Sequence, residues 1–166
     1  MKKLVHTIPP VYDENSRILI LGSFPSVKSR ESEFFYGHPQ NRFWPLMARL
    51  TNCELPITIE EKKALLIKNR IALWDVVASC EIKGSSDSSI RSVIANDIYP
   101  ILKKAKISAI FTNGNKSAEL YKRYIEPEVR IKSITLPSTS PANAKMNLDS
   151  LFDVWNTLIS GALNNE

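Results

Sequence analysis

Four short apolar segments, separated by stretches of helical character, limit the fold of this 166-residue sequence more than any other feature. They cover residues 17–21, 71–77, 107–111 and 130–136. Short apolar runs are typical of buried strands, and their alternation with helices predicts βαβ units. We therefore expect an α/β fold, with one domain over residues 1–166 and a mostly parallel four-stranded sheet sandwiched between helices.

The stretches between these segments carry helix and loop signals. Helices are expected over residues 41–50, 59–68, 116–124 and 148–163. Thr58 is expected to be an N-cap, with Glu61 at the capping-box position. Residues 90–104 are predicted to form helical pieces broken around Tyr99-Pro100. The Gly, Pro and Ser residues of segment 23–39 predict a long loop, and such a loop inside a compact domain usually has a function.

The carboxyl ends of the predicted strands indicate where a ligand would bind. In parallel sheets the ligand crevice lies beyond these ends. Segments 22–25, 112–115 and 137–143 follow predicted strands and fit this position. We expect all three segments to converge on one edge of the sheet.

Composition narrows the class of protein. The net charge of +5 is compatible with binding to a polyanion such as DNA. No apolar run approaches the length of about 18 residues that a membrane-spanning helix needs, and no signal-peptide run follows the basic start. Two cysteines and two histidines are too few and too scattered for a metal site. We expect an intracellular, cytoplasmic monomer without membrane contact, metal or cofactor.

The loop after the first predicted strand carries the most chemistry. It begins Gly22-Ser23-Phe24-Pro25-Ser26, where glycine lets the backbone approach a ligand and successive N–H groups can bind an oxygen or phosphate. Phe24, Phe35 and Tyr36 offer flat faces on which a base can stack, a contact worth about 1–3 kcal/mol. The same rings could instead pin the loop to the core.

Together with a second segment, this loop resembles a known family. Gly22-Ser23-Phe24-Pro25-Ser26, followed by Tyr36-Gly37-His38-Pro39-Gln40-Asn41-Arg42-Phe43-Trp44, resembles the first signature of the mismatch-specific and hypoxanthine-specific branches of the uracil-DNA glycosylase superfamily. Leu73-Trp74-Asp75-Val76-Val77-Ala78-Ser79-Cys80 and Leu136-Pro137-Ser138-Thr139-Ser140-Pro141-Ala142-Asn143 resemble the hypoxanthine branch. With Thr112-Asn113-Gly114, the similarity runs in order over roughly residues 18–155.

The resemblance implies a monofunctional DNA glycosylase for hypoxanthine, the deaminated form of adenine. Such an enzyme flips the target nucleotide out of the helix and hydrolyses its N-glycosidic bond, which leaves an abasic site. Its catalysis needs a positioned water and stabilisation of the departing base. Double-stranded DNA is the expected partner, with single-stranded DNA as the second option.

Two positions depart from the wider superfamily pattern. Uracil enzymes carry a water-activating Asp, and mismatch enzymes an Asn, where this sequence has Phe24. Uracil enzymes also carry a His before Pro-Ser, where this sequence has Leu136. Both departures count against uracil as the preferred base. Asn41 resembles the catalytic Asn of the hypoxanthine branch and could orient the water.

Candidate site residues fall into three groups. Catalytic roles are expected for Asn41 and His38; base binding for Gly22, Ser23, Phe24, Pro25, Ser26, Tyr36, Phe43 and Asn113; and DNA binding for Ser138, Thr139, Ser140, Asn143 and Lys145. Structural alternatives stay open: a helix cap for Asn41 or Asn113, and a loop-pinning hydrogen bond for His38. Asp75 is either a base with a shifted pKa or, more commonly for a buried acid, a structural carboxylate. We assign no role to His6, which lies near the start of the chain.

Other functions stay open beside the leading one. The chain could be a glycosylase for uracil or for G·T and G·U mismatches. A non-catalytic DNA- or nucleotide-binding domain on the same scaffold is possible, because a fold does not fix a function. An enzyme acting on free nucleosides would not need the DNA-facing loop after Leu136.

Overall fold

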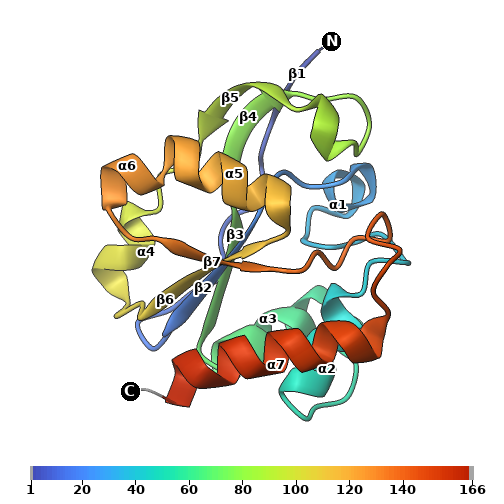
Figure 1. Ribbon diagram of the computed structural model, residues 1–166, viewed down its shortest axis with the longest axis vertical. Coiled ribbons are helices and arrows are strands. Elements are labelled where there is room, and N and C mark those ends of the chain that lie inside the picture. The colour runs from blue at the N-terminus through green and yellow to red at the C-terminus, as the bar shows by residue number, and fades with distance from the viewer. Residues whose placement is uncertain (1, 165–166) are drawn as a thin grey trace.

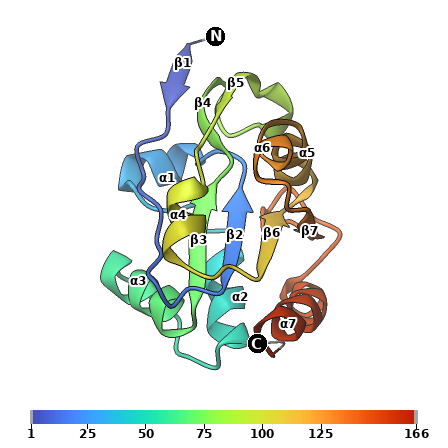
Figure 2. The ribbon, with the colours of Figure 1, turned by 90° about the vertical axis from the view of Figure 1, so that its left-hand side faces the viewer.

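Four parallel strands form the centre of the molecule, a computed structural model that describes residues 2–164. They are β2 (Ile18–Gly22), β3 (Ile71–Asp75), β6 (Ala109–Asn113) and β7 (Ser133–Leu136). The order across the sheet is β3-β2-β6-β7, and every neighbouring pair is parallel (Figure 2). Every residue of β2 is buried, because helices cover both faces of the sheet. The predicted α/β fold with a four-stranded parallel sheet is confirmed.

The helices form two layers, one on each face of the sheet (Figure 1). One layer holds α2 (Phe43–Leu50), α3 (Ile59–Lys68) and α7 (Leu148–Asn164); the other holds α4 (Tyr99–Lys104), α5 (Asn115–Tyr124) and α6 (Glu126–Val129). Each layer packs its apolar side chains against one face of the sheet, so the buried residues form two core clusters. None of the helices within residues 2–164 has the length and hydropathy required to cross a membrane.

Helix α3 begins where the local sequence predicts. The Thr58 side chain accepts a hydrogen bond from the Glu61 N–H at 3.1 Å, and Glu61 Oε1 accepts one from the Thr58 N–H at 2.9 Å. This reciprocal capping box satisfies two amide groups that the first turn of a helix leaves unpaired. The hydrogen bonds to its carboxylate also lower the pKa of Glu61.

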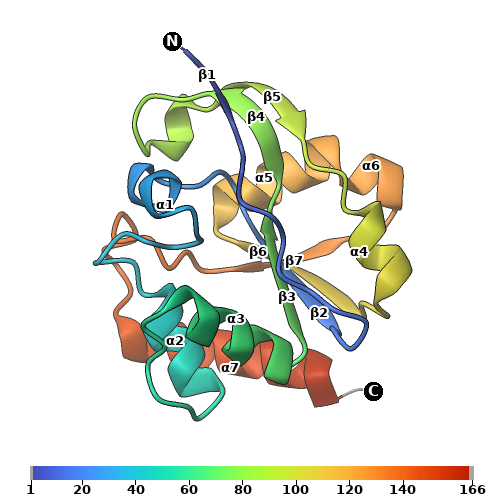
Figure 3. The same cartoon turned by 180° about the vertical axis from the view of Figure 1, so that it is seen from behind.

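A second, smaller sheet was not predicted. It contains β1 (Lys3–Val5), β4 (Val77–Glu81) and β5 (Arg91–Ala95) in the order β1-β4-β5, with antiparallel pairing (Figure 3). Over residues 91–95 the helical prediction is therefore wrong, because this segment pairs with β4 instead. Pro100 does not break a helix either: it lies in the first turn of α4, where a missing N–H costs nothing.

The long loop predicted over residues 23–39 contains one short helix, α1 (Val27–Ser32). Ser26 caps it by accepting a hydrogen bond from the Ser29 N–H at 3.2 Å. The rest of the segment returns to the carboxyl ends of the parallel strands, beside the loop that follows β7 (Figure 1). A shorter helix, η1 (Asp87–Ser89), lies between β4 and β5.

Candidate active site

A cavity of about 290 Å³ lies at the carboxyl ends of the parallel strands. This volume is near the lower end of the range of about 300–1,000 Å³ that is typical of small-ligand sites. Its walls come from the three segments expected to converge there, from residues 26–41, from the end of β3 and from the loop before β5. The lining residues include Gly22, Ser23, Phe24, Pro25, Ser26, Tyr36, His38, Asn41, Asp75, Ser85, Asp87, Asn113, Ser138, Thr139 and Ser140. The predicted convergence of the three segments is confirmed.

Tyr36 provides an aromatic wall of the cavity. Its ring stacks on Phe43 with the centroids 4.0 Å apart and an interplanar angle of 17°. The backbone of Tyr36 has a φ of +54°, an uncommon conformation that often marks functional sites. Burial raises the pKa of Tyr36, and the nearby Asp75 adds to this shift.

Phe43 does not contact the cavity as predicted. Its side chain is fully buried, and it is absent from the lining. The side chain points into the core beneath Tyr36 because Phe43 lies on the inner face of α2. Phe43 therefore supports the Tyr36 ring and leaves the opposite ring face as the one that can stack on a ligand.

Asn41 and His38 both line the cavity. The Asn41 Oδ1 atom accepts a hydrogen bond from the Phe43 N–H at 2.9 Å. Asn41 is nevertheless not the N-cap of α2, because Arg42 holds that position and the helix has no side-chain cap. The bond from Phe43 leaves the Asn41 Nδ2 hydrogens and a second lone pair of Oδ1 for a ligand or water. His38 Nδ1 accepts from the Gln40 N–H at 3.1 Å, which places the proton of the neutral ring on Nε2. Each residue thus combines a loop-fixing bond with a free polar group.

Asn113 joins two walls of the cavity. Its Nδ2 atom donates to the Tyr36 hydroxyl at 3.1 Å and to Thr139 Oγ1 at 3.0 Å, and its Oδ1 atom accepts from the Thr139 N–H at 3.1 Å. The helix-cap alternative for Asn113 is wrong, because α5 has Gly114 at its N-cap and no side-chain cap. Since both Nδ2 hydrogens are in use, a base could reach only the remaining lone pair of Oδ1.

The loop between β7 and α7 is held by Arg42. The Arg42 guanidinium donates to the carbonyl oxygens of Ser140 at 2.7 Å, Asn143 at 3.0 Å and Thr139 at 3.3 Å, and also to that of Met146. Thr139 is fully buried within this arrangement, so the predicted contact with DNA phosphates is not available to its side chain. Burial follows from the bonds of Thr139 to Asn113, which draw it inward.

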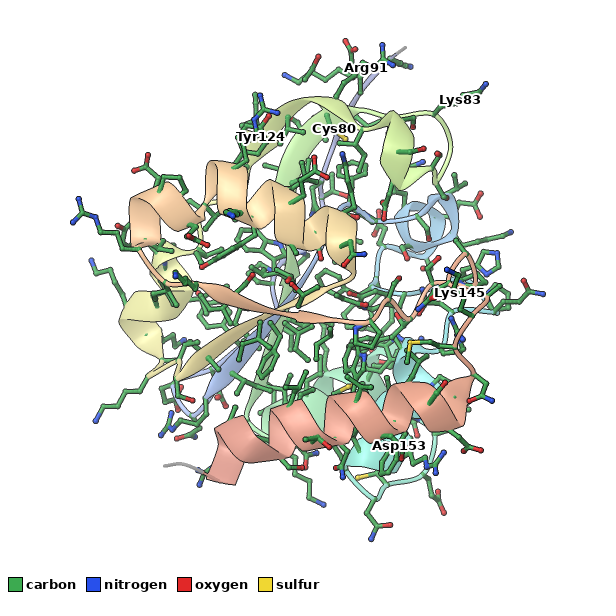
Figure 4. The ribbon with its side chains drawn as sticks, viewed as in Figure 1. Cys80, Lys83, Arg91, Tyr124, Lys145 and Asp153 are labelled. Carbon is green, nitrogen blue, oxygen red and sulfur yellow. The ribbon has the colours of Figure 1, made fainter. Side chains whose placement is uncertain are left out.

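Four other residues expected to bind DNA lie on the same loop. Ser138 and Ser140 line the cavity, and their hydroxyl oxygens accept from the N–H groups of Ser140 and Ala142, both at 3.1 Å. Asn143 Nδ2 donates inward to the Ser138 carbonyl at 3.0 Å. Lys145 is exposed, on the side of the molecule that carries α1 (Figure 4).

Two features of the site were missed in the sequence. His6 Nε2 is 2.8 Å from Asp75 Oδ2, with 1% and 5% of the two side chains exposed. Asp87, exposed at the rim, accepts from the Ser23 hydroxyl at 2.8 Å. Partial loss of hydration raises the pKa of Asp87. The hydrogen bond from Ser23 lowers this pKa, whereas repulsion from Asp75 raises it further. Asp75 was weighed in the sequence as a buried acid on an apolar strand, but its partner was not identified, because His6 lies outside every motif.

Comparison with known proteins identifies the family. A family model of the uracil DNA glycosylase superfamily matches residues 9–159. The chain belongs to this superfamily. It is 38% identical over 144 residues to hypoxanthine DNA glycosylase of Methanosarcina acetivorans, an alignment that covers 84% of this chain and 88% of that protein. The hypoxanthine DNA glycosylase of Methanosarcina barkeri is 38% identical over 114 residues, or 67% of this chain and 72% of that protein.

A solved structure supports the same assignment. The solution NMR structure of a protein described as a uracil DNA glycosylase, from Methanosarcina acetivorans, superposes with a TM-score of 0.75. It is 34% identical, and the match covers 92% of this chain and 96% of that one. Within the superfamily pattern, Phe24 and Leu136 hold positions where uracil enzymes carry polar groups. Here both side chains are buried and apolar, with exposures of 7% and 0%.

Proposed function

We propose that the chain is a monofunctional hypoxanthine DNA glycosylase and that residues 1–166 act as one catalytic domain. The similarity to two hypoxanthine DNA glycosylases over most of the chain carries the choice of base. The cavity supports this choice of base, because Asn41 and the aromatic wall of Tyr36 both line it. The side chain at position 24, where uracil enzymes carry an Asp, is here the apolar ring of Phe24. The size of the cavity suits one flipped base.

The proposed reaction is hydrolysis of the bond between the sugar and the base. The flipped base stacks on the free face of Tyr36, and the sugar gains oxocarbenium character as the bond breaks. Asn41 orients the attacking water by hydrogen bonding, since an amide cannot remove a proton. The water oxygen bonds to the sugar carbon, and the base leaves with a proton. His38 Nε2–H is a donor that can stabilise the departing purine.

We further propose double-stranded DNA as the substrate, a monomeric protein and action in the cytoplasm. The loop over residues 137–145 ends beside the cavity and carries Ser138, Ser140 and Lys145. Such groups suit contacts to phosphates around a flipped nucleotide. The positive net charge supports binding that weakens as salt rises.

The test is base release from duplexes that carry a single deoxyinosine, with deoxyxanthosine, uracil and a G·T mismatch alongside. We expect hypoxanthine release by the wild type and a loss of at least about a hundredfold in Asn41→Ala, as for removal of one transition-state contact. Asn41→Ser keeps an acceptor for the Phe43 N–H, so it separates the loss of this local hydrogen bond from the loss of chemistry.

Thr58→Ala is the matched control. It removes a side-chain-to-backbone hydrogen bond, the N-cap of α3, outside the cavity, and should cost about 0.5–2 kcal/mol of stability with little change in rate. Equal activity of Asn41→Ala and wild type would contradict the role of Asn41. Intact DNA binding without release of any base would contradict the proposed activity.

Uracil release is the second candidate, because the similar solved structure is described as a uracil DNA glycosylase. In this chain Leu136 is fully buried and offers no hydrogen-bond donor to a base oxygen. We expect uracil release to be much slower than hypoxanthine release. Faster release of uracil in the same assay would reverse this order.

A further inference from the structure

Asp75 is a buried carboxylate for which the proposed reaction has no use so far. It ends β3, opposite Gly22 on β2, and its side chain is 5% exposed. It lines the cavity together with Tyr36 and Asn113. A carboxylate taken out of water in this way needs compensating hydrogen bonds.

His6 satisfies one oxygen of that carboxylate and fixes its orientation. The Ile8 N–H donates to His6 Nδ1 at 3.2 Å, so the proton of the neutral ring lies on Nε2. Nε2–H then donates to Asp75 Oδ2 at 2.8 Å. The rings of Phe24, Phe35 and Trp74 surround the imidazole at centroid distances of 6.1–6.2 Å and restrict its movement.

The other oxygen, Oδ1, is directed at the cavity. No hydrogen bond from the described residues 2–164 reaches it, although the side chain is almost completely buried. Oδ1 lies against the Cα of Gly22, where an added Cβ would be 2.4 Å from Oδ1 and 2.9 Å from the Tyr36 hydroxyl. The free oxygen therefore lies close to the aromatic wall, at the place where the edge of a stacked base would approach.

We propose that Asp75 Oδ1 determines specificity by accepting a hydrogen bond from the ring N–H of a lactam base, the N1–H of a 6-oxopurine. His6 is the positioning residue that holds Asp75 for this contact. The inference rests on the proposed function and assigns the chemical feature of the base that the site recognises. Hypoxanthine has a hydrogen on N1, whereas adenine presents a lone pair there, which a carboxylate repels.

The contact also matches the chemistry of the carboxylate. Oδ1 remains accessible from the cavity, since no side-chain nitrogen or oxygen of the described residues is both fully buried and without a hydrogen-bond partner. A base with an N–H donor replaces water at Oδ1 with a hydrogen bond to a charged group, whereas a base without that hydrogen displaces the water and gives no hydrogen bond in return. A base without the N1 hydrogen should therefore be released roughly tenfold to a hundredfold more slowly.

The first test uses the wild-type protein and three duplexes, with deoxyinosine, 1-methyldeoxyinosine or unsubstituted purine deoxynucleoside at one position. The methylated base keeps O6 but adds bulk, and unsubstituted purine adds no bulk but lacks O6; both lack N1–H. We expect both to be released at least tenfold more slowly than hypoxanthine. Release of both at the rate of hypoxanthine overturns the inference and leaves the proposed function intact. No release of hypoxanthine contradicts the proposed function itself.

The second test is Asp75→Asn. An amide keeps the size of the carboxylate and can present an N–H to the cavity, where it would face the lone pair on N1 of unsubstituted purine. We expect hypoxanthine release to fall at least tenfold and the ratio of purine to hypoxanthine release to rise. An unchanged ratio overturns the inference. Binding to undamaged duplex and the thermal unfolding midpoint show whether the variant is folded.

The role of His6 is tested by His6→Phe and His6→Gln. Phenylalanine fills the aromatic surroundings but cannot donate to Asp75, whereas glutamine restores an N–H donor. We expect the preference for hypoxanthine over 1-methylhypoxanthine to shrink in His6→Phe and to recover in part in His6→Gln. A purely structural His6 would change stability and leave that preference as in the wild type.

Discussion

Gly22 is a position at which the cavity wall is tightly packed. It ends β2 and lies opposite Asp75, with the Tyr36 hydroxyl also nearby. Any side chain there would have to displace groups from two different elements. The close approach explains why a glycine follows the buried strand, and it gives a test of how accurately the wall must be placed.

Gly22→Ala should therefore impair base release more than folding. The new Cβ would lie 2.4 Å from Asp75 Oδ1, so the carboxylate and Tyr36 must shift. We expect a loss of tenfold or more in release of hypoxanthine and about 1–3 kcal/mol of stability, as for overpacking. Single-turnover release and thermal unfolding provide the measurements. Gly161→Ala, in α7 with no atom within 4 Å of the added Cβ, is the control and should be neutral or stabilising. Wild-type activity in Gly22→Ala would show that the wall is not critical.

For single residues, the sequence predicted which side chains line the cavity better than it predicted the hydrogen bonds between them. Tyr36, Asn41 and Asn113 were identified by motif, and all three line the cavity. The bond between His6 and Asp75 joins residues 69 positions apart, and no local pattern reports a contact over such a separation. The burial of Thr139 was also invisible, because it depends on the Asn113 side chain of another strand.

Among the elements, the start of α2 and the loop before α7 are joined by hydrogen bonds of Arg42. Arg42, the residue before α2, donates to carbonyl oxygens of Thr139, Ser140, Asn143 and Met146. The planar guanidinium suits several acceptors at once, whereas an ammonium does not. Since Asn41 is the adjacent residue, the DNA-facing loop and the proposed water-positioning amide share one support.

Arg42→Lys should loosen this loop while the sheet and its core stay folded. Loop carbonyls left without partners cost about 1–3 kcal/mol, and the loop backbone should become more mobile. We expect faster amide hydrogen exchange over residues 138–146 and weaker binding to DNA. The control is Arg49→Lys on α2, where the ion pair with Asp149 is exposed and worth about 0–1 kcal/mol. Unchanged exchange in Arg42→Lys would contradict the role of Arg42 in holding the loop.

The element predictions succeeded where the pattern was local. The apolar runs gave the parallel strands, and the capping box gave the start of α3. Strand β5 was mistaken for helix because its side chains are mostly exposed and its pairing partner, β4, decides its conformation. Tertiary pairing of this kind overrides weak local propensity.

For the whole molecule, the distribution of charge around the cavity matters more than the net charge of +5. Asp75 lies inside the cavity and Asp87 at its rim, on the side where the proposed DNA substrate would approach. An acidic rim repels phosphates, so Asp87 should weaken binding to undamaged DNA. The raised pKa of Asp87 makes this repulsion sensitive to pH.

Asp87→Asn should bind undamaged duplex about two- to fivefold more tightly at neutral pH and low salt, because one negative charge leaves the rim. Since the pKa of Asp87 is raised, wild-type Asp87 gains a proton earlier than an ordinary Asp as pH falls. The ratio of the two affinities should therefore approach one in acid. Fluorescence anisotropy across pH provides the measurement, and Asp153→Asn on α7 removes an equal charge outside the cavity lining (Figure 4). Equal affinities at neutral pH would show that Asp87 does not face DNA.

The overall architecture followed from the sequence because a buried parallel sheet needs continuous apolar strands and places the ligand-binding loops at one edge. The small sheet of β1, β4 and β5 could not be predicted from the sequence, because β1 is only three residues long and mostly exposed. Its existence depends on pairing between the start of the chain and β4. This pairing brings His6 to the cavity.

The position of His6 has a practical consequence for anyone who handles the protein. The pocket depends on a residue just past β1, so a tag or a deletion at that end acts close to the base-recognition surface. The two ends of the described chain lie at opposite extremes of the molecule, with α7 far from β1 (Figure 1). Fusion partners and surface-immobilisation handles therefore belong after α7, where they leave the histidine undisturbed.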